Sequence, residues 1–132
     1  MNVKQFKHLL STMFGITCPK YIVFEEKLGG IRAFSKSLMS FKPDFRGFTV
    51  FSNGSFTHAF AMAFGHLADK HVIDLDKYEL KNVLMGKSIE VDTENGTYIA
   101  RFKSYPVCIG FVENGIFYPS IPKKFRRAIY DV

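Results

Sequence analysis

The pattern that decides the fold lies in residues 96–120, GTYIARFKSYPVCIGFVENGIFYPS. Short apolar stretches flank Asn114-Gly115, and Asn-Gly between extended segments is the strongest short signal for a tight β-hairpin. A second Asn-Gly, at 95–96, follows an alternating stretch, KSIEVD. We therefore predict a meander of antiparallel strands over residues 87–92, 97–104, 106–112 and 116–119.

Three segments upstream of residue 87 have helical patterns. Residues 3–14 place apolar side chains at helical spacing and end at a glycine. Residues 55–67 are apolar nearly all round, which is typical of a buried helix, and either Ser55 or Thr57 could be its N-cap. Residues 76–86 carry a capping box at one end and a glycine stop at the other.

Extended segments separate these helices. Residues 21–27, 47–52 and 71–75 read as strands, whereas the stretch after the Gly29-Gly30 turn is predicted to be a short helix or irregular. The fold class is therefore α+β, with an N-terminal helix and helices that flank an antiparallel sheet. Such a sheet loses its exposed edges when it curls, so we expect a small, partly closed β barrel.

Composition limits the class of protein. A chain of 132 residues, 47% hydrophobic and 16% aromatic, is one domain in size and can bury a core without metal or disulfide support. Cys18 and Cys108 stand far apart, which excludes a zinc ribbon or a redox pair and predicts reduced thiols. The first 18 residues lack the apolar core of a secretory signal and no stretch is long enough to span a membrane, so we expect a cytoplasmic protein with no membrane partner.

The net charge of +6 is unevenly distributed. Residues 1–66 carry +5, residues 67–100 carry −3, and residues 101–132 carry +4. A basic surplus favours phosphate-bearing partners or anionic membranes and does not choose between them.

The candidate binding residues lie in the last third of the chain. Arg101 and Lys103 are expected to alternate on one strand face, with Tyr105 just beyond them. The final segment adds four cations around Phe125: Lys123, Lys124, Arg126 and Arg127. Cations neutralise phosphates, and exposed rings stack on unpaired bases, with Tyr105, Phe117, Tyr118 and Phe125 as candidate platforms. The alternative is an ordinary solvated strand face followed by a tail that aids solubility.

Catalytic patterns are missing from the sequence. The four histidines have no metal-ligand spacing, no GxSxG elbow occurs, and Gly29-Gly30 lacks the residues of a phosphate loop. We therefore predict a protein that is not an enzyme and that has no catalytic residue, metal site or cofactor. A small-ligand site or an enzyme in the mouth of the barrel stays as a third possibility.

The second half of the chain resembles a known family. Its ordered matches are Thr57, Ala61 and Gly65; Leu84, Gly86 and Ile89; Gly96, Tyr98 and Ile99; Gly110 and Gly115; and Pro122, Lys123 and Arg126. In these positions the chain resembles the PUA-like RNA-binding domain found at the C-terminus of rRNA cytosine-5 methyltransferases, and in small stand-alone, mainly archaeal proteins predicted to act in ribosome biogenesis. The similarity covers residues 47–132 well and residues 1–46 loosely.

The resemblance implies a PUA-like antiparallel β pseudo-barrel over residues 47–132, with residues 1–46 as a helix and strand extension packed on it. It implies a non-catalytic protein that binds structured RNA, such as rRNA or tRNA, in rRNA maturation or RNA modification. The chain is too short to hold a methyltransferase domain and lacks its catalytic cysteine motif, so a separate enzyme would have to methylate. The segment FSNGSFTH lacks the family's frequent basic residue, which leaves Arg46 and His58 as candidates there. The alternative function is an adaptor that docks on an RNA-modifying enzyme or a ribosome-assembly factor.

Overall fold

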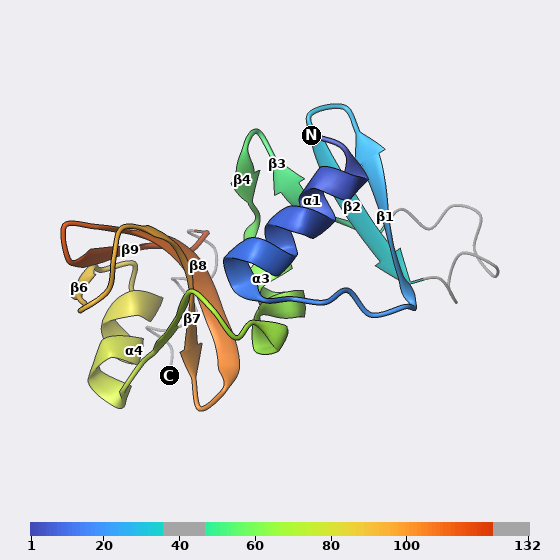
Figure 1. The fold of residues 1–132 in the computed structure, drawn as a ribbon. Coiled ribbons are helices and arrows are strands. Elements are labelled where there is room, and N and C mark those ends of the chain that lie inside the picture. Colours follow the sequence, from blue (N-terminus) through green and yellow to red (C-terminus); the bar gives the residue numbers. More distant parts are fainter. Residues whose placement is uncertain (36–46, 123–132) are drawn as a thin grey trace.

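Two β-sheets and three helical segments make up the computed structural model, which describes residues 1–35 and 47–122 (Figure 1). The chain begins with helix α1 (Val3–Leu9), which continues as a π-helical turn (Leu10–Phe14) and ends at Gly15 in the left-handed conformation. The first sheet has the order β1-β2-β3-β4, with all neighbours antiparallel. Its strands are β1 (Ile22–Lys27), β2 (Gly30–Ser35), β3 (Phe48–Ser52) and β4 (Ser55–Phe56).

The second sheet curls strongly and has the order β5-β7-β8-β9-β6 (Figure 1). Helix α3 (His58–Phe64) and a 3₁₀ turn (Gly65–Leu67) lead into it. Strand β5 pairs with β7 in parallel, and every other pair in this sheet is antiparallel. Its elements are β5 (Val72–Asp74), helix α4 (Lys77–Leu84), β6 (Ile89–Glu90), β7 (Gly96–Phe102), β8 (Tyr105–Glu113) and β9 (Ile116–Ser120).

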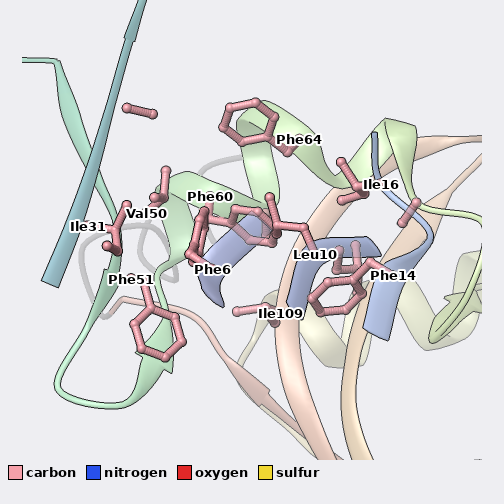
Figure 2. Close-up of a cluster of buried hydrophobic side chains, with 14 of the residues drawn as sticks. Phe6, Leu10, Phe14, Ile16, Ile31, Val50, Phe51, Phe60, Phe64 and Ile109 are labelled. Atoms are coloured by element: carbon pink, nitrogen blue, oxygen red, sulfur yellow. The ribbon is translucent and has the colours of Figure 1, made fainter. Parts of the chain in front are cut away.

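Each face of the second sheet contributes to a different hydrophobic core. On one face, Ile99 and Ile109 join a cluster with α1, the first sheet and α3, and Figure 2 shows its labelled side chains meeting in one interior. The other face packs against α4, with Val83 and Phe117 fully buried in the second cluster. The second sheet is therefore a shared wall between the two cores.

The local signals read from the sequence are confirmed at the helix ends. Thr57 caps α3, since its hydroxyl accepts a hydrogen bond from Phe60 N at 3.1 Å. Asp76 and Glu79 form both bonds of the capping box of α4, at 2.7 and 3.0 Å. The α+β class and the N-terminal helix are confirmed as well.

Two predictions about the strands are wrong. Residues Gly30–Ser35, directly after the glycine turn, form strand β2. Gly30 permits its pairing with β3, since a Cβ there would collide with the carbonyl of Phe51. Asn95-Gly96 does not close a hairpin, since β6 pairs with β9 and not with β7. Asn95 instead accepts a bond from Asn114 N at 2.9 Å, so its side chain braces the true hairpin turn between β8 and β9.

The predicted division at residue 46 falls within the first sheet. Strand β2 belongs to the N-terminal segment and pairs with β3, which begins at Phe48. Phe6 of α1 also lies in one buried cluster with Phe60 of α3. Residues 1–35 thus share both a sheet and a core with the rest of the chain. Across the described ranges, no helix has the length and apolar character needed to cross a bilayer.

Gly110 lies where strand β9 and the Phe117 ring approach the backbone of β8 closely. A Cβ at this position would lie 2.5 Å from both the Phe117 ring and the carbonyl oxygen of Tyr118. We expect Gly110→Ala to lower the free energy of unfolding by about 3 kcal/mol, because neither the backbone nor the buried ring can move away freely. Gly54→Ala is the matched control: it has open space around the Cβ and costs only the left-handed backbone, about 1–2 kcal/mol. Urea unfolding measures both, and equal stabilities of the two variants would contradict the prediction.

Candidate nucleic-acid interface

The turn between β7 and β8 presents a cation and an aromatic ring to solvent. Lys103 and Ser104 form it with positive φ angles of 49° and 71°. Lys103 therefore lies in the turn and not on a strand face alternating with Arg101, as the sequence predicted. Its ammonium group sits 5.4 Å from the centre of the Phe102 ring, and Tyr105, the first residue of β8, is 76% exposed. A phosphate or a base could reach both Lys103 and Tyr105.

Arg101 is largely enclosed by the protein. Its side chain is only 18% exposed, and Nη1 donates to the carbonyl of Ala68 at 3.0 Å. Its Nε lies 4.0 Å from the carboxylate of Asp74, its register partner on β5. These contacts hold the end of the 3₁₀ turn against the sheet, so Arg101 offers a phosphate much less surface than Lys103 does.

Strand β9 runs toward the β7–β8 turn. Ile116 lies opposite Glu113 and Ser120 lies opposite Ile109, so each step along β9 moves closer to Tyr105 at the start of β8. Lys123, Lys124, Arg126 and Arg127, together with Phe125, lie outside the described residues, as does Arg46. The last described residue, Pro122, is the point from which the chain continues into the four cations.

A groove of about 730 Å³ adjoins Pro122. Pro122, Ile121 and Val107 line it together with His58 at the start of α3. The groove thus brings His58, one of the two candidates near the FSNGSFTH segment, to the residue that precedes the terminal cations. Its other described lining residues are mostly apolar: Thr49, Thr57, Ala59, Met62 and Leu84.

The predicted stacking platforms differ in exposure. Phe117 is fully buried in the core under α4, so the prediction that it is a platform is wrong. Tyr118 is 51% exposed, and Phe111, which the sequence did not single out, is 47% exposed. Phe111 lies directly opposite Tyr118 in the β8–β9 register. Equal spacing from the Asn114-Gly115 turn could have identified this pair.

Cys108 and His71 are held in structural roles. Burial raises the pKa of the Cys108 thiol to about 12, so it stays protonated and is not a nucleophile at neutral pH. His71 stacks on Tyr98 with ring centres 4.7 Å apart, and its Nδ1 lies 2.9 Å from the carbonyl of Thr97. Among the described residues, no three His, Cys, Asp or Glu side chains gather as metal ligands would.

No family model matches this chain, and no curated protein matches it significantly.

Proposed function

We propose that this chain is a non-catalytic RNA-binding protein with a PUA-like pseudo-barrel, which binds structured RNA through a basic surface. The surface comprises Lys103 and Tyr105 at the β7–β8 turn together with the four terminal cations, with Arg101 as a minor contributor. The family resemblance suggests a role in rRNA maturation or RNA modification in the cytoplasm. A separate RNA methyltransferase or ribosome-assembly factor would then be the partner.

The observation that carries the proposal is the direction of β9. Its register with β8 leads the chain toward the turn that exposes Lys103 and Tyr105, and the four cations follow directly after Pro122. Ile121 and Val107 line one groove, so this end of β9 lies beside the start of β8. A surplus of +4 over residues 101–132 then favours a polyanion at this edge of the sheet.

Binding of a base-paired RNA hairpin by the wild-type protein should depend steeply on salt. Five cations, Lys103 and the four terminal ones, predict a slope of log K against log salt of roughly −4, since each neutralised phosphate contributes about 0.7–0.9. Fluorescence anisotropy over a series of KCl concentrations measures it, with duplex DNA of the same sequence as the comparison. RNA should bind more tightly, because A-form geometry and 2′-hydroxyls distinguish it. A slope near zero would overturn the proposal, and equal affinity for DNA would overturn its RNA specificity.

The second candidate function is a protein-interaction adaptor, and the 730 Å³ groove favours it. Met62 on α3 is 46% exposed at this groove, and Leu84 and Val107 extend its apolar lining. Apolar surface of this kind is typical of docking sites for proteins. Met62→Ser removes the apolar side chain without adding charge. It should leave RNA binding unchanged if RNA is the ligand, and should abolish co-purification of a partner enzyme if docking is the function.

A further inference from the structure

A second groove, of about 300 Å³, lies between the two sheets. Leu9 and Met13 line it from the N-terminal helix, and the β3–β4 hairpin contributes Gly54 and Ser55. Strands β7, β8 and β9 form the opposite wall. The groove is therefore separate from the one beside Pro122, and residues from both halves of the chain build it.

Two aromatic rings on the β8–β9 wall are available to a ligand. Phe111 and Tyr118 lie directly opposite each other in register, and each is about half exposed, at 47% and 51%. Within the described ranges neither ring contacts another aromatic ring, although Phe51 and Phe56 of the facing hairpin pack together at 5.2 Å. On the same sheet face Ile109, two residues before Phe111, is buried. The two rings therefore lie on the same sheet face as the first core, at the point where the packed elements no longer cover that face.

The polar side chains among the described lining residues of this groove are neutral hydroxyls. Thr97 on β7 lies opposite Phe111, and Ser120 and Ser55 add hydroxyls at the rim. No hydrogen bond within the described part of the chain uses these three hydroxyls. The described lining includes no Lys, Arg, Asp, Glu or His. Flat rings beside free hydroxyls suit a planar, uncharged ligand that presents hydrogen-bonding edges.

We propose that this groove binds one unpaired nucleobase of the RNA, stacked on Phe111 and Tyr118. The inference rests on the proposed function and adds the kind of RNA feature that is recognised: an unpaired base beside a helix. The RNA would make two kinds of contact with different surfaces. Its phosphates are attracted to the cations of a protein with a net charge of +6, whereas the neutral groove accepts an uncharged base. The volume, at the low end of the roughly 300–1,000 Å³ typical of ligand pockets, suits one base better than a protein helix.

An RNA hairpin with a single bulged adenine, and the same hairpin without the bulge, test this inference. Phe111→Ala/Tyr118→Ala should weaken binding of the bulged hairpin by about 10- to 100-fold, because base stacking on each ring is lost. It should leave the fully paired hairpin and the salt slope unchanged. Tyr21→Ala/Tyr78→Ala removes two rings that are 63% and 77% exposed elsewhere, and is the matched control. Phe111→Tyr/Tyr118→Phe keeps both rings and should bind like the wild type.

The outcomes separate the inference from the proposed function. Equal binding of the bulged hairpin by the wild type and a folded double-alanine variant overturns the nucleobase site and leaves RNA binding intact. Failure of the wild type to bind either hairpin overturns both. A second test needs no variant: the bulged base is replaced by the fluorescent base 2-aminopurine, and its fluorescence is recorded as the wild-type protein binds. Quenching on binding supports stacking in the groove, and unchanged fluorescence of the bound hairpin overturns it.

Discussion

Replacing Lys123, Lys124, Arg126 and Arg127 together by alanine is expected to weaken binding of structured RNA by roughly two orders of magnitude or more. Phosphate neutralisation supplies most of the affinity of a protein that reads RNA by shape and backbone, so removal of four of five cations should leave little of it. The slope of log K against log salt should also flatten by about 3, at about 0.7–0.9 per lost phosphate contact. Anisotropy titrations at several KCl concentrations measure both quantities.

A control variant with the same net charge as the terminal quadruple variant shows whether RNA binds at a local site or is attracted by the overall charge of the protein. Alanine at Lys4, Lys7, Lys20 and Lys27 also lowers the net charge from +6 to +2, and all four side chains are exposed in the N-terminal half. This variant should keep most of the affinity and most of the salt slope. Equal losses in the two quadruple variants would mean that RNA is attracted by overall charge alone, and the assignment of the site to the chain end would be wrong.

Side-chain patterns predicted the local elements of this fold well because each signal acts within a few residues. The capping box at Asp76 depends only on the chain between Asp76 and Glu79, and Asn114-Gly115 closes a turn between adjacent strands. Strand order is a different problem, since Asn95-Gly96 has the same letters as Asn114-Gly115 and no hairpin role. Which strand pairs with β6 is decided by burial of Ile89 beside Phe117, residues far apart in sequence.

The candidate site was also predicted only in part, because contacts between residues far apart in sequence are not visible in local patterns. Tyr105 is exposed as expected. Lys103 is exposed too, although it lies in the β7–β8 turn and not on the strand face that the sequence predicted. The enclosure of Arg101 depends on Ala68 and Asp74, which a parallel strand brings alongside β7. Parallel pairing of β5 with β7 leaves no turn signal between the strands, since a helix and β6 intervene. The sequence therefore could not show that Arg101 is already committed to protein contacts.

Phe60→Ala should cause the largest loss of stability of any single substitution considered for this chain. Phe60 is fully buried on α3, and its ring lies 4.7 Å from Phe56, 5.6 Å from Phe64 and 5.8 Å from Phe14, measured between ring centres. Truncation leaves a cavity among rigid rings that cannot collapse easily, so we expect the free energy of unfolding to fall by about 3–5 kcal/mol. That is a large share of the roughly 5–15 kcal/mol that holds a domain folded.

Urea unfolding followed by circular dichroism measures this loss, with Met62→Ala as the control two residues away on the same helix. Met62 is 46% exposed, so its truncation should cost much less than that of Phe60. The shape of the transition adds a second result. Because Ile99 and Ile109 of the second sheet belong to the same core as Phe60, both sheets should unfold in one cooperative step. Two separate transitions in Phe60→Ala, with the second as stable as in the wild type, would show instead that the second sheet and α4 form an independent domain.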